Sequence, residues 1–317
     1  MAATNRSKDD LINESTGLYK DNTAGDISAA DLRDGIYSIF QPQGICQGRL
    51  TLESGVPVST TDQTAKTNVY FTPYLGNCIG LYDGTSWKLH TFTEKTLALG
   101  TLTSGLPYDV YIYDNAGTLT LESLAWTNGT TRATALTTQD GVYVKTGATT
   151  RRYLGTFYTT ATTTTEDSLT KRYLWNLYNQ VPRPLLTTDA TNTWTYNSTT
   201  YQESNGTTNR IAIVTGLAIS RLRLMHVHGN LSVSSSVTAT VGIGEDSTTT
   251  NNATVKYPSD PQNTGTSLHV TSIDKIAALG VHFYARVERT VGGSITFIGD
   301  GNGPDHYQTG MTGDIIS

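Results

Sequence analysis

YDVYIYDNAGTLTLESL, residues 108–124, decides the fold class of this chain. Valine and isoleucine alternate with polar or aromatic residues before residue 114, and leucine alternates with threonine after residue 117. Each half therefore has the two-residue period of a β-strand. The residues between them, Asp-Asn-Ala-Gly, are typical of a tight turn. The stretch predicts a β-hairpin.

The same period extends through the region around this hairpin. NCIGLYDGTSWKL, residues 77–89, predicts a second hairpin that turns at Asp83-Gly84. Further strands are predicted over residues 141–145 and 152–159. The pattern therefore predicts a β-domain for this block.

The last third of the chain has a cleaner β pattern. Apolar residues alternate with small or polar ones over residues 237–243 and again over 281–287. Gly292-Gly293 then predicts a two-residue hairpin into the strand 294–298. Short, evenly spaced strands of this kind indicate a β-sandwich or jelly roll.

Residues 1–41 differ from the rest of the chain. Ser28 and Asp31 form a variant of the capping box at the start of a helix predicted over residues 28–40. Four apolar residues recur on one face of that helix, Leu32, Ile36, Ile39 and Phe40. This face either folds back on its own domain or anchors the chain to another protein.

A second helix is predicted in KRYLWNLYNQVPRPL, residues 171–185. Four apolar residues there have helical spacing, Leu174, Leu177, Tyr178 and Val181. Pro182 ends the pattern, because proline lacks an N–H donor and restricts the residue before it. The helix either packs on its own domain or forms an oligomer interface, in which three copies build a short stalk around an axis.

These patterns predict a mainly β chain in three parts. Residues 1–41 form an N-terminal arm with an anchoring helix, and residues 42–183 form a central β-domain that ends in the short helical segment. Residues 184–317 form a C-terminal β-sandwich or jelly-roll-like head, joined by a stiff extended link at Pro182-Arg183-Pro184.

The composition excludes several classes of partner. Charged residues make up 15% of the chain, the net charge is -5 and threonine is about 18%. The surface is therefore rich in hydroxyl groups and has no basic stripe for nucleic acid. No apolar run reaches the ~18 residues of a membrane span, so we expect no membrane insertion. Cys46 and Cys78 are expected as free thiols, with a single bridge as the alternative.

Catalytic and metal-binding motifs are missing from the sequence. It contains no nucleophile elbow, phosphate-binding loop or zinc-binding cysteine pair, so we expect neither an enzyme nor a cofactor. His226 and His228 are the weak candidates for a metal, because residues two apart on a strand share a face. Ordinary hydrogen-bonded histidines are the alternative.

Aromatic residues offer candidates for glycan contact. Trp194, Tyr196 and Tyr201 lie in a polar run, residues 187–209, that shows no core alternation. Exposed aromatic rings can stack on sugars while nearby hydroxyls bind their polar edges. The alternative is that these rings suit half-buried strands.

Several of these segments together resemble structural proteins of tailed-bacteriophage virions. TAGDISAADLRDGIYSIF, residues 23–40, resembles the arm at the start of fibre and appendage proteins. Residues 72–89, 108–160 and 167–185 resemble a β-domain that recurs in virion proteins. Residues 282–303 and 310–317 are similar to trimeric jelly-roll heads.

The resemblance implies a virion protein, assembled in the cytoplasm of the bacterial host, that forms a homotrimer. It implies an arm that contacts capsid, neck or baseplate proteins and a distal domain that meets the host surface. The aromatic residues named above make a host-surface glycan a candidate partner. A trimeric fibre or spike is the first expectation. A capsid decoration or cement protein is the alternative, and a spike-borne polysaccharide depolymerase is a weaker one, because no repeats indicate a β-helix.

Overall fold

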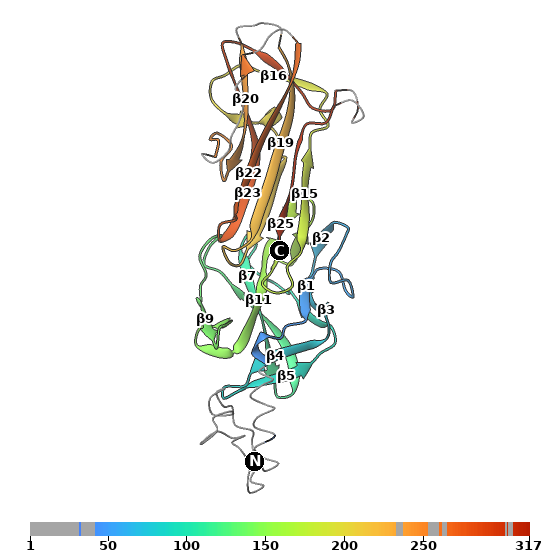
Figure 1. Ribbon diagram of the computed structural model, residues 1–317, viewed down its shortest axis with the longest axis vertical. Coiled ribbons are helices and arrows are strands. Elements are labelled where there is room, and N and C mark those ends of the chain that lie inside the picture. Colours follow the sequence, from blue (N-terminus) through green and yellow to red (C-terminus); the bar gives the residue numbers. More distant parts are fainter. Residues whose placement is uncertain are drawn as a thin grey trace, which may run out of the picture.

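The computed structural model describes residue 32 and residues 42–232, 237–252, 260–261, 265–301, 303 and 307–317. It is mainly β, as the sequence predicts. Figure 1 shows two β modules arranged along the long axis, and the described fold begins at the end that carries β4 and β5. Of the predicted arm helix, Leu32 has helical backbone geometry and is exposed. Ile36, Ile39 and Phe40 lie outside the described residues.

The central module contains η1 (Pro42–Gly44) and the first strands of the chain. These are β1 (Gly48–Thr51), β2 (Gln63–Lys66), β3 (Asn68–Pro73), β4 (Cys78–Tyr82), β5 (Trp87–Thr91), β6 (Lys95–Ala98), β7 (Pro107–Asn115), β8 (Thr118–Ala125), β9 (Leu136–Gln139), β10 (Val142–Lys145), β11 (Ala148–Ala161), β12 (Thr164–Asp167), β13 (Lys171–Arg172) and β14 (Leu174–Asn176).

Both predicted hairpins of this module are confirmed. β7 pairs with β8, and Asn115 faces Thr118 across a turn in which Ala116 and Gly117 both have positive φ. Such a turn matches the right-handed twist of the strands it joins. β4 pairs with β5 around Asp83-Gly84, where the Asp83 carboxylate accepts two backbone N–H groups.

The C-terminal head contains the remaining strands. These are β15 (Pro182–Thr188), β16 (Thr193–Tyr196), β17 (Gln202–Glu203), β18 (Arg210–Thr215), β19 (Arg221–Ser232), β20 (Thr238–Glu245), β21 (Asp260–Pro261), β22 (Gly265–Ile276), β23 (Gly280–Val291), β24 (Ile295–Ile298) and β25 (Gly310–Ile316), with the short η2 (Ser204–Gly206).

Two sheets face each other in the head. One has the order β15-β25-β19-β24-β16, with β22 on the other side of β19, and the other contains β17, β18, β20, β21 and β23. Apolar side chains from both sheets form a buried cluster between them, including Leu222, Leu224, Ile243, Tyr284 and Ile315. The head is therefore a β-sandwich.

The two modules share a sheet. β13 of the central module pairs in parallel with β18 of the head, so one sheet continues from module to module. Buried side chains reinforce this joint: the Trp175 indole N–H donates to Ser220 Oγ at 2.7 Å. Arg132 binds Asp109 in its own module and donates to the backbone oxygen of Gly216 in the head. The modules are thus joined by backbone and by buried polar contacts.

The predicted helix over Lys171–Val181 is wrong, because this segment forms strands and a turn. Leu174 pairs with Phe157 and Trp175 with Thr156 across β14 and β11. Leu174 and Trp175 point to opposite sides and are buried in two different clusters. A strand that is covered on both faces has a continuous apolar run instead of an alternation, and here that run imitates helical spacing.

The remaining residues of the predicted stalk lie against their own module. Leu177 and Tyr178 are half-buried beside these same clusters, and the Arg152 guanidinium lies 4.6 Å from the Tyr178 ring centroid. The backbone of Val181 exchanges two hydrogen bonds with Ser317. The proposed interface of Leu174, Leu177, Tyr178 and Val181 is therefore not a helical face.

Two predicted connections also differ. Pro182-Arg183-Pro184 is no free link, since it starts β15, an edge strand of the head; prolines suit such an edge because they lack an N–H. Gly292-Gly293 does not close a hairpin. β23 and β24 belong to opposite sheets, so these glycines, at φ +89° and +154°, carry the chain from one sheet to the other.

Cys46 and Cys78 are both free thiols, as expected. Burial raises the pKa of Cys46 to about 11, so its thiol stays protonated at neutral pH. In the part of the chain that the structure describes, no helix has the length and apolar character needed to cross a membrane.

Candidate functional site

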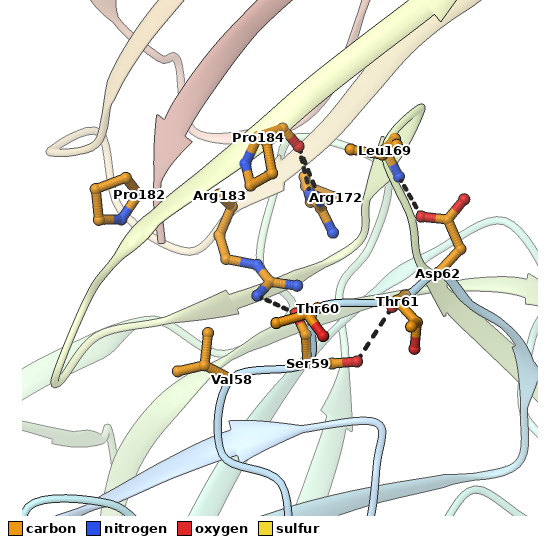
Figure 2. Close-up of a pocket in the computed structure, with 10 residues that line it drawn as sticks. All are labelled: Val58, Ser59, Thr60, Thr61, Asp62, Leu169, Arg172, Pro182, Arg183 and Pro184. Atoms are coloured by element: carbon orange, nitrogen blue, oxygen red, sulfur yellow. Dashed lines mark hydrogen bonds between the residues drawn. The ribbon is translucent and has the colours of Figure 1, made fainter.

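A cavity of about 520 Å³ opens where the two modules meet (Figure 2). Its walls are the loop before β2 on one side and the start of β15 on the other. The lining residues are Val58, Ser59, Thr60, Thr61, Asp62, Leu169, Arg172, Pro182, Arg183 and Pro184. The lining contains no histidine or cysteine; its ionisable side chains are those of Asp62, Arg172 and Arg183.

One carboxylate binds both arginines that line this cavity. Asp167, at the end of β12, accepts from Arg172 at 3.3 Å and from Arg183 at 2.7 Å, and all three side chains are buried. Arg172 also donates to the backbone oxygen of Pro184, and Arg183 to that of Ser59. The two guanidinium groups therefore tie the central module to the first strand of the head.

A third buried arginine lies beside this pair. Arg49 donates to the backbone oxygens of Asn179 and Ser317. Burial, together with the positive charge of Arg183, lowers the pKa of Arg49 to about 10, so it remains charged at neutral pH. Arg49 lines a smaller neighbouring pocket together with Asp167 and Arg183. Asp62, which lines the larger cavity, is exposed and accepts the Leu169 N–H at 2.8 Å.

A second polar cluster lies inside the head, enclosed between its two sheets. His226 Nδ1 is 3.0 Å from the carbonyl oxygen of Gly242, and His228 Nδ1 is 3.3 Å from His226 Nε2. His228 Nε2 is 3.7 Å from Glu288 Oε2. These three side chains are fully buried. The two imidazoles form a hydrogen-bonded row that ends at the carbonyl oxygen of Gly242, and Glu288 lies beyond the other end of the row.

The row fixes where the protons lie. A carbonyl only accepts, so His226 carries its proton on Nδ1 and accepts on Nε2. His228 must then donate from Nδ1, which leaves its Nε2 without a proton in the neutral ring. That Nε2 faces Glu288 Oε2 at 3.7 Å, a separation too long for a direct hydrogen bond.

The titration of these groups agrees with this assignment. Burial raises the pKa of Glu288 to about 7, although hydrogen bonds from Trp194 and Gln202 to the carboxylate oppose the rise. Burial, assisted by the charge of Arg286, lowers the pKa of His226 to about 3. The pKa of His228 lies well below its usual value for the same reason, with His226 as a further cause. Both rings are neutral at pH 7.

The Glu288→Gln variant tests this arrangement. The folded state holds the Glu288 proton more tightly than the unfolded chain, so this group's contribution to stability is present below pH 4.5 and is lost as the pH rises through 7. Glutamine keeps the size of the side chain but does not titrate. Wild type loses this contribution between pH 5 and pH 8, and the variant does not. We therefore expect the free energy of unfolding of the variant minus that of wild type to rise by about 2–3 kcal/mol over this pH range.

Urea denaturation at both pH values measures this difference. An equal effect of the substitution at pH 5 and pH 8 would contradict the protonated Glu288. In the pH profile of wild-type stability, His226 and His228 contribute in the opposite direction. Their lowered pKa values favour the folded state above pH 6.5, and this contribution is lost as the pH falls below 6.5.

The predicted metal candidates are thus explained by hydrogen bonding. His226 and His228 share a face, as expected, but they point at each other and at the protein. In the described ranges, no group of three or more His, Cys, Asp or Glu side chains is placed to hold a metal ion.

The predicted glycan contacts lie partly in the core. Trp194 and Tyr196 belong to β16 and pack on a buried cluster, so the run does have alternation. The Trp194 indole N–H donates to Glu288 at 2.8 Å, and its ring stacks on Phe297. Tyr201 is half-buried, with the Arg289 guanidinium 4.8 Å from its ring centroid. Glycan contact by these residues stays a prediction.

Sequence reasoning missed the charged core of the head. On β23 the side chains of Tyr284, Arg286 and Glu288 face the interior of the sandwich. The alternation with alanine and valine indicated instead that the alanine and valine side chains face it. Arg286 is balanced by Asp189 at 2.9 Å, and both are buried. Arg286 and Glu288 lie opposite Ile243 and Val241 on β20. The sequence pattern of β23 alone does not contain this pairing.

A comparison with known protein families found no match, and a comparison with curated proteins found no significant similarity.

Proposed function

We propose that this chain is a non-enzymatic structural subunit of a tailed-phage virion, a fibre or spike that attaches through its N-terminal arm and exposes its head to the host. The observation that carries the proposal is the continuous connection between the two modules. A shared sheet and buried contacts at Trp175, Arg132 and Asp167 make one stiff body out of two β-domains.

The polarity of the molecule supports the same function. η1, which lies next to the arm in sequence, packs on β4 and β5. These strands lie at the end of the molecule opposite β16 and β20 of the head (Figure 1). An appendage needs this arrangement, since it is held at one end and presents the other.

The buried clusters also suit a structural role. The histidine, glutamate and arginine groups of the head are buried within the sandwich. The open cavity at the joint is lined by groups that already bind one another. Both clusters stabilise the fold.

A phage that lacks this chain provides the test. We expect particles of normal head stability that fail to adsorb to the host. Fragile heads with normal adsorption would instead support a capsid cement protein. Release of reducing ends, when the purified chain is incubated with host surface polysaccharide, would contradict a non-enzymatic role.

A further inference from the structure

The outward face of the six-stranded head sheet is more apolar than a solvent-facing sheet should be. On β22 the outward residues Leu268, Val270 and Ile276 are 68%, 41% and 52% exposed. The inward residues of the same strand include His269 and Thr271, both buried. A strand with one wet face normally places its apolar residues inward. Along much of β22 the order is reversed.

The apolar surface continues onto neighbouring strands. Val270 faces Val227 on β19, and the next outward residue of β19 is Met225, which is 41% exposed. Across β25, Thr312 lies between Met225 and the exposed Leu186 of β15. The outward face therefore carries a contiguous patch, defined here as Leu186, Met225, Val227, Leu268 and Val270.

The shape of this outward patch suits close packing. Gly229 is opposite Leu268 and Gly310 is opposite Val227, so no side chain stands on these positions beside the patch. Next to it runs a groove of about 310 Å³ whose lining includes Met225, Ser272 and Thr312. Large apolar patches of this kind mark surfaces that another molecule covers.

Charges lie at only one end of this face. Arg221 and Arg223 both bind Asp274 there, and Asp314 is opposite Arg223 on β25. Each copy of the chain thus carries both signs at the same end, so two copies can exchange ion pairs. The middle of the face carries no charged residue.

β22 is also exposed along its side. It pairs with β19, and no further strand pairs with it among the described residues. Natural proteins protect long edges with charges, prolines or bulges. β22 carries charges near one end alone, at Asp274 and at Lys275, which binds Glu245 at 2.7 Å; residues 265–273 lack this protection in the isolated chain.

We propose that this face, made by β15, β25, β19 and β22, packs against another copy of the same chain. Four strands of 7–12 residues cover roughly 600 Å², of the order of the ~800 Å² that each partner contributes to a standard interface. The inference deepens the proposed function, since an appendage is built from several copies. It places the contact on the head sheet instead of on a helical stalk.

Sedimentation velocity of the full chain tests the contact. We expect wild type to sediment as an oligomer at micromolar concentration, and the Met225→Asp/Val270→Asp variant to sediment as a monomer of 34.2 kDa. Leu89→Asp is the matched control, because Leu89 is 54% exposed on β5 of the other module. It should keep the wild-type mass.

A milder variant guards against misfolding. Met225→Gln/Val270→Thr keeps the size of both side chains on an exposed face, and circular dichroism should match wild type. We expect its self-association to weaken at least about tenfold. A monomeric wild type, or a Gln/Thr variant that associates as tightly as wild type, would overturn the proposal. Neither result depends on where the chain lies on a particle, so failure here is distinguishable from failure of the virion assignment.

Discussion

Replacing Asp167 with alanine is expected to lower the free energy of unfolding by about 3–5 kcal/mol, because it leaves two buried guanidinium groups without their counter-charge. Arg172 and Arg183 are both buried, and Asp167 is the one carboxylate that binds them among the described residues. Their remaining bonds, to the backbone oxygens of Pro184 and Ser59, do not neutralise charge.

Urea denaturation at pH 7 measures this loss. Asp167→Asn keeps the shape of the side chain and should fall between alanine and wild type. Asp62→Ala is the matched control in the same cavity: this carboxylate is exposed and accepts one backbone N–H, so about 1 kcal/mol is expected. A loss below about 1 kcal/mol for Asp167→Ala would mean that the arginine cluster does not hold the joint.

The Trp175→Ala variant is expected to lose a similar amount, about 3–5 kcal/mol, through the cavity that it leaves. Trp175 is fully buried where β14 meets the head, and it stacks on Tyr153 with ring centroids 6.4 Å apart. Its indole N–H also donates to Ser220, the residue just before β19 of the head. The variant therefore weakens the core of the central module and the joint together.

A graded series separates these two effects. Trp175→Phe keeps most of the ring but leaves Ser220 Oγ without its donor, so a loss of about 1–3 kcal/mol is expected. Ser220→Ala removes the bond from the other side and keeps the ring. If Trp175→Ala unfolded within about 1 kcal/mol of wild type, Trp175 would not be part of a cohesive joint.

The hairpins could be predicted because their information is local. Two strands with a period of two and a turn of Asp-Gly or Ala-Gly require nothing from the rest of the chain. β7–β8 and β4–β5 obey this rule. The Gly292-Gly293 turn looks the same in sequence, but the choice between closing a hairpin and changing sheets depends on which strands are already paired.

Strands buried on both faces could not be recognised from periodicity. The sequence of β14 imitates a helix because Leu174 and Trp175 each enter a core, one in front of the sheet and one behind it. On β23 the interior-facing row contains Arg286 and Glu288, which local patterns assign to solvent. Asp189 balances Arg286, and Trp194 and Gln202 donate hydrogen bonds to Glu288; all three partners are distant in sequence.

The outward apolar patch of the head has a sequence signal that is easy to misread. Leu268 and Val270 alternate with His269 and Thr271, which taken alone indicates that the leucine and valine face the core. The pairing of β22 with β19 reverses this, because His228 opposite His269 faces inward. Burial is therefore set by the register of the two strands and not by the hydropathy of one.

Reconstruction of purified phage particles by electron cryo-microscopy tests the central claim most directly. We expect symmetric copies of the two-module body projecting from the particle surface, with the β4–β5 end toward the particle and the head outward. Absence of the chain from purified particles, or a surface density that the two-module body does not fit, would contradict it.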